Sequence, residues 1–580
     1  MRSILSILSA AVIAAAVSCS GPKDGTYSLT LLTTNDVHGT FFDSTYVGGN
    51  VKRSLYAVKY VVDSVRASVG DENVILVDAG DIVQGDNAAY YFNYVDTLTP
   101  HVYPRIAKYM GYDAVVLGNH DIEAGHPVYD RLVRDMKAEG IPLLAGNAIR
   151  NDNGQRYFPV YTILKRQGLK IAVLGYDNAN IAGWLPERLW SGMKFESLIP
   201  LVRQDVDEVI AKEKPHVVIV AVHSATGSGD GTVLESQGLD LMKSLPGVDF
   251  LVCSHDHRPK VVESDTLCLI NSGSHSRFVG HGQINFTIKG GKVTGKSVTA
   301  DLIPVERLKI DKEMSRVFHD DYLAVKNFTT KKVGELKVDL LTRDAYTGMS
   351  PYLNLIHTLS LRCSPAKISF AAPLTFNGTV KAGTLVYNDL FTVYPFENQV
   401  YVVNMTGKEI KDYLEASYDN WINTVSKPTD HVLKIAHRAD PRTGAESWSF
   451  VERSYNFDSA GGLVYTVDVT QPFGERVSIE SMVGGEALDS GKTYPVAMTS
   501  YRASGGGGLM TKIGIDTGKI EERVVEIYPE FRKLLYEYLL EKGSIDPEAI
   551  SDKNTIGEWR FIPERVAKPA LEKDMNLIFK

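Results

Sequence analysis

The sequence is poor in cysteine, with four in 580 residues. This scarcity excludes a disulfide-stapled scaffold, because such scaffolds are small and dense in cysteine. Setting Cys19 aside, three cysteines remain, so at most one internal disulfide can form. Cys253 and Cys268 lie in neighbouring apolar runs and are the candidate pair. The preferred alternative is that both are buried thiols, since strand interiors commonly hold cysteine.

The sequence also lacks a dense run of basic residues. Its formal net charge is −8, and neither lysine nor arginine clusters along the chain. This balance argues against polymeric nucleic acid as a partner. Small anions remain possible ligands, because bound metal cations would dominate the local field of a site.

No segment is apolar over a length that spans a bilayer. The longest candidate, Ile4–Val17, is too short for a membrane helix and is typical of a signal-peptide core. Ala16-Val17-Ser18-Cys19 resembles a bacterial lipobox, and a polar tether, Gly21–Gly25, follows it. We therefore expect an exported chain anchored in the cell envelope through a lipid on Cys19. An ordinary signal peptide, with Cys19 incidental, is the alternative.

The length predicts more than one domain. We predict a leader and tether over residues 1–25, a first domain over 26–305, a linker over 306–332 and a second domain over 333–580. In the first domain, strand-like runs alternate with the amphipathic stretches Ser54–Val69, Pro127–Glu139 and Val202–Lys214. This alternation predicts a layered α/β domain.

The pattern becomes mixed after a predicted connecting helix at Asp311–Asn327. A mixed α+β second domain is expected from three predicted helices and three predicted strands. The helices are Ser350–Cys363, Lys408–Trp421 and Pro529–Lys542, and the strands are Lys367–Ala372, Leu463–Val469 and Thr493–Thr499.

Six apolar runs of the first domain each end in polar residues that can hold or serve a metal ion. Buried strands read as continuous apolar runs, and ligands of open sheets collect just past the strand ends. These residues should therefore converge, although they lie far apart in the chain. The set contains His, Asp and Asn but no Cys, which suits a hydrolytic site with two divalent metals. Its members are Asp36, His38, Asp81, Asn119, His120, Asp177, His223, His255 and His257.

Spacing assigns chemistry to some of these residues. Asp36 and His38 are two apart, so on an extended strand end both side chains would point the same way. Asp81 follows Gly80, which allows close approach, and its carboxylate has enough lone pairs to bridge two cations. His120 adjoins a ligand and suits a group that protonates the leaving oxygen.

These motifs, Asn35-Asp36-x-His38, Gly80-Asp81, Gly118-Asn119-His120-Asp121, His223 and His255-x-His257, resemble the calcineurin-like metallophosphoesterase set. The two-domain layout resembles the bacterial 5′-nucleotidase superfamily over nearly the whole mature chain. The resemblance implies a four-layer α-β-β-α metallophosphoesterase domain, followed by a C-terminal nucleotide-specificity domain.

The resemblance also implies roles for single residues. His120 would be the catalytic imidazole, partnered by Glu123 where the family commonly has Asp, with Asp121 as a competing partner. Zn, Mn, Fe and Co all suit these ligand types. One divalent metal would be held by Asp36, His38, Asp81 and His257, and the other by Asp81, Asn119, His223 and His255.

The second domain indicates a branch. The 5′-nucleotidases usually carry Gly-Gly-Ile-Arg, but Ala371–Gly378 has no Arg here. They also carry Gly-Gly-Asp-Gly-Phe, but Gly505–Leu509 has no Asp. The chain is instead similar to the 2′,3′-cyclic-nucleotide 2′-phosphodiesterase/3′-nucleotidase branch, in Trp184–Gly192, Ala372-Pro373, Tyr394-Pro395, Tyr455–Asp458 and Tyr501–Ala503.

That branch implies a base stacked on aromatic side chains. Tyr501 is the best candidate, and Tyr394 and Phe457 compete for the opposite face, with core packing as their alternative. The expected protein is an exported dimetal phosphohydrolase of 2′,3′-cyclic nucleotides and nucleoside monophosphates. A 5′-nucleotidase or nucleotide-sugar hydrolase is the enzymatic alternative. The alternative from a different class is a non-catalytic nucleotide-binding surface protein. Such a protein would be expected to lack at least one metal ligand, but all seven ligand positions are filled here.

Overall fold

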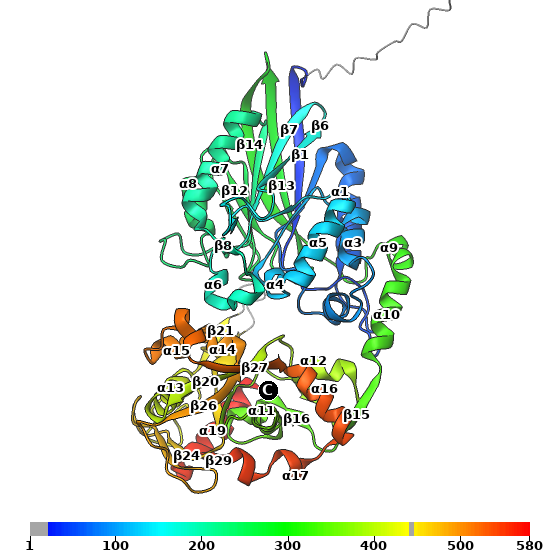
Figure 1. Cartoon of the computed structure of the whole chain (residues 1–580). Helices are drawn as coiled ribbons and strands as arrows, with labels where there is room; N and C mark the ends of the chain where they lie inside the picture. The colour runs from blue at the N-terminus through cyan, green and yellow to red at the C-terminus, as the bar shows by residue number, and fades with distance from the viewer. Residues whose placement is uncertain (1–20, 440–445, 580) are drawn as a thin grey trace, which may run out of the picture.

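The chain folds into two domains joined by a helical linker (Figure 1). The computed structural model describes residues 21–439 and 446–579, so the predicted leader and Cys19 lie outside the described residues. Within the described ranges, no helix combines the length and the apolar character needed to cross a membrane.

Two six-stranded sheets form the centre of the first domain. The first sheet has the order β14 (Lys292–Pro304), β13 (Phe278–Lys289), β1 (Gly25–Thr34), β2 (Val74–Asp78), β3 (Ala114–Val116) and β4 (Leu143–Leu144). The second has the order β11 (Lys260–Glu263), β12 (Cys268–Asn271), β10 (Phe250–Cys253), β9 (Val217–Val222), β7 (Leu169–Tyr176) and β6 (Tyr161–Arg166).

The sheets pack face to face, and helices cover their outer faces. One core lies between the sheets, where Leu31, Val77 and Ile219 are buried together. A second core lies under α1 (Leu55–Val69), α3 (Val102–Met110) and α5 (His126–Ala138), and a third under α7 (Leu198–Glu213) and α8 (Gly238–Ser244). The predicted four-layer α-β-β-α arrangement is confirmed. Every residue of β9 is buried, which explains its continuous apolar sequence.

The linker differs from the single helix predicted at Asp311–Asn327. It forms two helices, α9 (Lys312–Val317) and α10 (His319–Thr329), separated at Phe318. Phe318 has non-helical φ/ψ of −101° and 18°, and its side chain is buried in the core of the first domain. The break lets the chain bury Phe318 and still place Tyr322 in a stack on Tyr46.

A five-stranded sheet organises the second domain. Its order is β23 (Ser459–Gly461), β17 (Ile368–Ala371), β26 (Thr493–Thr499), β20 (Gln399–Thr406) and β27 (Val524–Glu530). Helices α11 (Pro351–Cys363) and α16 (Phe531–Lys542) contribute to the core on one side, and α13 (Gly407–Trp421) to the core on the other. The predicted mixed α+β class and all six predicted elements are confirmed, including β24 (Leu463–Asp468) outside this sheet.

Cys253, Cys268 and Cys363 are free thiols. In the parallel pairing of β10 with β12, Cys268 lies opposite Phe250, and Cys253 lies opposite Asn271. The two cysteines are therefore three residues apart in register, roughly 10 Å along the strands. A disulfide needs Cα atoms within about 7 Å, so register excludes the candidate pair.

Candidate active site

All seven predicted ligands follow the carboxyl ends of β1, β2, β3, β9 and β10 and meet at one end of the two sheets. Two groups have ligand atoms within 4.8 Å of one another and share Asp81: Asp36, His38, Asp81 and His257 form one, and Asp81, His223 and His255 form the other. Asn119 adjoins the second group, because its Oδ1 lies 2.9 Å from His255 Nδ1.

The backbone that presents the ligands is left-handed rather than extended. Asp36 and His38 both have φ of 48°, so the prediction that a strand pleat aligns them is wrong. Asp81, His255 and His257 also have positive φ, between 58° and 71°. Such conformations are costly for residues other than glycine and persist where surrounding contacts hold them. Here the Asp36 N–H donates to the Gly80 carbonyl at 2.8 Å, and the His38 N–H to that of Asp81 at 3.0 Å.

Two glycines leave room for the shared carboxylate. A Cβ on Gly80 would lie 2.8 Å from His223 Nδ1 and 2.7 Å from the Gly118 nitrogen. A Cβ on Gly118 would lie only 2.3 Å from Asp81 Oδ1. A side chain at either position would push the candidate ligands apart, which explains why glycine precedes Asp81 and Asn119.

The orientation of the donors fits divalent cations. Asp81 Oδ2 and His223 Nε2 face each other at 3.1 Å, are buried, and have no hydrogen-bond partner among the described residues. On the other side of the cluster, the Nε2 atoms of His38 and His257 lie 2.9 Å apart. Buried polar atoms are normally paired. These inward-facing carboxylate and imidazole atoms are donors that first-row divalent metals accept.

Burial and charge prepare the donors for a metal. Burial lowers the pKa of His38 to about 3 and that of His255 to about 4, so both imidazoles are neutral and keep a lone pair. Burial alone would raise the pKa of Asp81, but the His223 and His120 imidazoles hold it well below its usual range. The shared carboxylate is therefore ionised.

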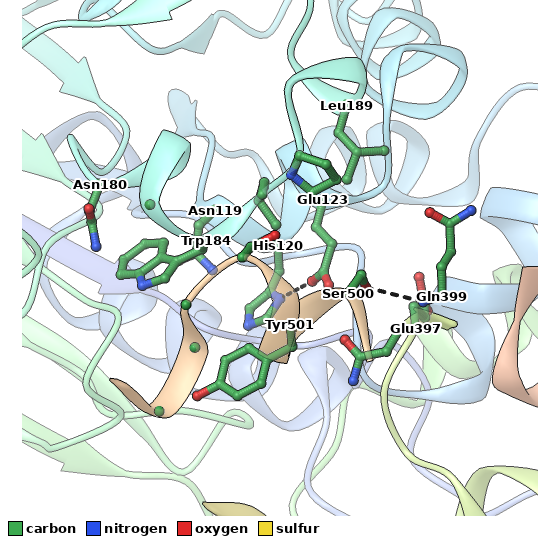
Figure 2. Close-up of a pocket in the computed structure, with 18 of the residues that line it drawn as sticks. Asn119, His120, Glu123, Asn180, Trp184, Leu189, Glu397, Gln399, Ser500 and Tyr501 are labelled. Atoms are coloured by element: carbon green, nitrogen blue, oxygen red, sulfur yellow. Dashed lines mark hydrogen bonds and ion pairs between the residues drawn. The ribbon is translucent and has the colours of Figure 1, made fainter. Parts of the chain in front are cut away.

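His120 lies beside this cluster in the short helix α4 (Asn119–Glu123). Its Nδ1 lies 2.5 Å from Glu123 Oε2, a contact that Figure 2 marks with a dashed line. Burial opposes protonation of His120, but the carboxylates of Asp81 and Glu123 outweigh it and raise its pKa to about 9. Glu123 thus occupies one ring nitrogen of His120, Nδ1, as a hydrogen-bond partner. The imidazole borders a cleft.

Asp121 does not partner His120, contrary to the alternative raised by the sequence. Its buried carboxylate accepts backbone N–H groups from Gly118, Asp81, Ile82 and Val83 at 2.9–3.0 Å. With four backbone donors already bound, Asp121 shapes the loop that carries Asp81, and it has no lone pair aimed at the imidazole.

A cleft of about 1070 Å³ separates the two domains at this point. Figure 2 shows His120, Glu123 and Trp184 of the first domain facing Tyr501, Ser500 and Glu397 of the second. Tyr501 belongs to the short helix α14 (Ser500–Ala503), which follows β26. The cleft therefore joins the candidate metal cluster to the aromatic residue predicted to stack on a base.

Tyr394 and Phe457 do not reach the cleft, so their prediction as base-stacking residues is wrong. Tyr394 is 1% exposed and stacks on Phe531 at a centroid distance of 4.4 Å. Phe457 is fully buried and stacks on Trp421 at 5.6 Å. Both rings complete cores of the second domain, so the alternative of core packing holds for both.

Sequence reasoning missed two residues: Tyr455, which lines the cleft, and His275, whose ring neighbours a candidate ligand. Tyr455 lines the cleft, and its ring lies 6.3 Å from that of Tyr501 at an interplanar angle of 88°. The two rings are perpendicular, so they do not form a parallel sandwich. His275 lies 5.1 Å from His38 between ring centroids. Tyr455 stood in a segment that the resemblance had singled out, but no sequence signal separates it from Phe457 two positions later.

The run Gly505–Gly508 supports Tyr501. A Cβ on Gly506 would lie 2.3 Å from the Tyr501 ring, so the loop backbone packs directly against that ring. Arg502 anchors the same helix, because it pairs with Asp458 at 2.9 Å and donates to the Gly506 carbonyl at 2.6 Å. The glycines allow a backbone contact that holds Tyr501 at the cleft.

Comparison with known families matches both domains. Residues 29–259 match the calcineurin-like phosphoesterase family, and residues 332–513 match the 5′-nucleotidase C-terminal domain family. A 5′-nucleotidase of Vibrio cholerae is 25% identical over 583 residues, covering 90% of this chain and 95% of that protein.

Two further similarities extend over most of the chain. The trifunctional nucleotide phosphoesterase protein YfkN of Bacillus subtilis is 21% identical, over 92% of this chain and 39% of that longer protein. A Staphylococcus aureus structure solved in complex with α-ketoglutarate has a TM-score of 0.74 and 20% identity, covering 92% of this chain and all of the other. At that identity, the structural match establishes the shared two-domain fold.

Proposed function

This chain belongs to the bacterial 5′-nucleotidase superfamily as a metal-dependent phosphoric ester hydrolase, and we propose that it hydrolyses 2′,3′-cyclic nucleotides and nucleoside monophosphates. The products are nucleoside and phosphate. Two groups of residues that share Asp81 would each hold a divalent metal ion: Asp36, His38, Asp81 and His257 in one, and Asp81, His223 and His255, with Asn119 beside them, in the other.

One observation carries the proposal. The interdomain cleft has the candidate metal cluster and His120 on one wall and the exposed part of Tyr501 on the other. A nucleotide carries a phosphate ester at one end and a base at the other. Its phosphate suits the cations, and its base suits an aromatic face, since stacking tolerates every base.

The residues of the chain suggest how the ester is cleaved. Two bound divalent cations would supply an activated water and stabilise charge on the phosphoryl oxygens. Asp81 fixes the two groups of ligands relative to each other, because it belongs to both. His120 protonates the leaving oxygen with one ring nitrogen, while Glu123 holds the other nitrogen at 2.5 Å and fixes the ring.

The second domain favours cyclic and 3′-nucleotides over 5′-nucleotides. Neither Ala371–Gly378 nor Gly505–Leu509 has the Arg or Asp with which the 5′-nucleotidases commonly grip phosphate and ribose. Gly506 instead packs against Tyr501. A 5′-nucleotidase is the second candidate, and the name of the Vibrio cholerae relative favours it.

We also propose that the enzyme is exported and lipid-anchored at Cys19. The apolar stretch Ile4–Val17 and the lipobox-like Ala16–Cys19 support this location. An enzyme there would release a nucleoside from a nucleotide that is too charged to cross a membrane. Metabolic labelling with a fatty-acid analogue checks the anchor, and Cys19→Ala should abolish the label.

Phosphate release from a substrate panel tests the activity. Metal-stripped protein is incubated with 2′,3′-cyclic AMP, 3′-AMP or 5′-AMP, each with added Mn²⁺, Zn²⁺ or Co²⁺. We expect metal-dependent turnover, with the cyclic and 3′-nucleotides ahead of 5′-AMP. A clear preference for 5′-AMP would overturn the branch assignment and select the 5′-nucleotidase. Nucleotide that binds in equilibrium dialysis but is never cleaved would contradict the proposal, since a binding protein behaves in that way.

A further inference from the structure

Trp184 covers one face of a candidate metal ligand. Its ring stacks on the His255 imidazole with centroids 5.0 Å apart and an interplanar angle of 24°. Trp184 ends the short helix α6 (Ile181–Trp184), is half-buried and lines the interdomain cleft. Figure 2 shows it among the side chains of the first domain at the opening, together with Asn119 and His120.

His255 has few other constraints on its ring. Its backbone is left-handed with φ of 71°, and its N–H donates to the Asp36 carboxylate at 3.1 Å. These features place the backbone but leave the side-chain torsions free. The ring itself meets Asn119 Oδ1 at 2.9 Å, and His223 edge-on at 5.5 Å and 75°. The flat contact with Trp184 adds to these two contacts and restricts rotation of the imidazole out of the cluster.

The segment that carries Trp184 is tied to a second ligand of the same group. Asn178 Nδ2 donates to the carbonyl of His223 at 3.0 Å, and Asn178 Oδ1 accepts the N–H of Asn180 at 2.9 Å. Residues 178–184 follow β7, and they connect the His223 carbonyl, at the end of the neighbouring strand β9, to the ring that covers His255. Among the described residues, Trp184 makes no ring contact with His38 or His257, which belong to the other group.

We propose that Trp184 is a positioning residue that holds His255 in its metal-binding orientation and so selectively strengthens the second metal position. That position comprises Asp81, Asn119, His223 and His255. The inference rests on the proposed dimetal function and adds a residue to it. Partners that orient a metal-binding imidazole from outside the coordination sphere typically contribute about 10–100-fold to metal affinity.

Metal binding rather than turnover tests the inference. Metal-stripped wild type and variants are dialysed to equilibrium against graded Co²⁺, and bound Co²⁺ per chain is measured. Wild type should bind two ions. Trp184→Ala should keep one affinity and weaken the other by about 10-fold or more. Trp184→Phe, which keeps a flat ring, should bind both ions nearly as wild type does.

Trp190→Ala is the matched control, because Trp190 lies six residues after Trp184 and donates its indole N–H to the Leu185 carbonyl at 2.9 Å. It should leave both affinities unchanged. Trp184→Leu and the thermal unfolding midpoint of every variant guard against a simple loss of fold: Leu fills volume but has no flat face, and should weaken the second ion in a folded protein.

The outcomes separate the two proposals. A wild type that binds fewer than two Co²⁺ would overturn the dimetal centre, and this inference with it. Two ions in wild type and unchanged affinities in folded Trp184→Ala would overturn the role of Trp184 alone. Equal weakening of both ions, or the same loss in Trp190→Ala, would also overturn it, because either result indicates a general role in loop structure.

Discussion

Asp81 is the residue on which the proposed chemistry depends most, because it belongs to both candidate metal groups. Its Oδ1 accepts the backbone N–H of His120 at 2.9 Å, and its Oδ2 faces His223 at 3.1 Å. One carboxylate thus connects the two ligand groups to the helix that carries the proposed acid. His120 beside it has its own carboxylate, that of Glu123. Metal binding and proton transfer are therefore separable by single substitutions.

Asp81→Asn should lower bound metal and turnover together. The amide has one acceptor oxygen in place of two, and it carries no charge to offset the cations. Metal content by atomic emission, measured beside phosphate release, checks this. A variant that keeps two metals per chain and a near-normal rate would contradict the bridging assignment.

His120→Asn should instead retain metal while turnover falls by about 10²–10⁴-fold, the usual range for a lost acid–base group. His126→Asn is the control, since His126 lies outside the cleft lining and bonds Asp130 at 3.1 Å on α5. It should behave as wild type. Metal lost in proportion to activity in His120→Asn would make His120 a ligand.

At the scale of elements, the site is built from the loops that follow parallel strands. The carboxyl ends of the strands bring the ligands to one end of the two sheets. Residues with a left-handed backbone conformation then turn the side chains inward. The second domain uses a comparable device. A helix of one turn, α14, carries Tyr501, and the glycine run Gly505–Gly508 packs against it. Backbone shape therefore matters as much as side-chain type on both walls of the cleft.

Gly506→Ala should disturb Tyr501 without touching the metal cluster. A Cβ at this position lies 2.3 Å from the ring, so Tyr501 or the loop must move. We expect a higher KM for 3′-AMP and an unchanged rate on bis-p-nitrophenyl phosphate. Gly508→Ala is the control for backbone strain alone: its Cβ meets nothing within 4 Å, but its φ of 70° lies in the left-handed region, which Gly506 does not adopt. Equal KM changes in both variants would contradict the prediction, because only the Cβ at Gly506 meets the Tyr501 ring.

At the scale of the whole molecule, the two domains meet through a buried ionic cluster. Arg532 is 1% exposed and pairs with Glu397 at 3.3 Å and Glu530 at 3.4 Å. From the first domain, Tyr94 donates to Glu397 at 2.9 Å, and Tyr90 donates to Glu530 at 3.0 Å. The cluster borders the cleft and contains residues of both domains. It therefore helps to fix the position of one domain relative to the other.

Arg532→Ala should destabilise the protein by about 3–5 kcal/mol, because it removes a buried cation and leaves two largely buried carboxylates, 10% and 19% exposed, without it. Arg362→Ala removes an ion pair to Glu541 that is 43% and 53% exposed, so it should cost at most about 1 kcal/mol. Urea unfolding followed by fluorescence compares the two. Similar losses in both variants would show that the Arg532 cluster contributes no more than a surface pair.

Tyr501→Ala tests the division of labour between the domains. Stacking is worth about 1–3 kcal/mol per base, so KM for nucleotides should rise accordingly. Base-free esters such as bis-p-nitrophenyl phosphate should be almost unaffected, because the candidate metal ligands lie on the other domain. Kinetics on 2′,3′-cyclic AMP, 3′-AMP and the base-free ester check this. Equal losses on all three would make Tyr501 structural.

The sequence by itself determined the layers of the first domain and the places where ligands gather. Fully buried strands such as β9 must be apolar throughout. The first polar residue after such a run must therefore lie just past the carboxyl end of the strand, where ligands bind. The position of His223 in the cluster follows from that rule alone. The same local logic located α1, α11 and β26 within a residue or so of their observed bounds.

Only the tertiary structure decided which polar or aromatic neighbour does what. Asp121 and Glu123 both carry a carboxylate, but the turn of α4 directs one to backbone N–H groups and the other to His120. Phe457 and Tyr455 are two positions apart, and only Tyr455 lines the cleft. Such outcomes depend on contacts between segments that are distant in the chain, such as the contact of Trp184 with His255, 71 positions away. Periodicity reports which face of an element is buried, but it carries no information about what that face meets.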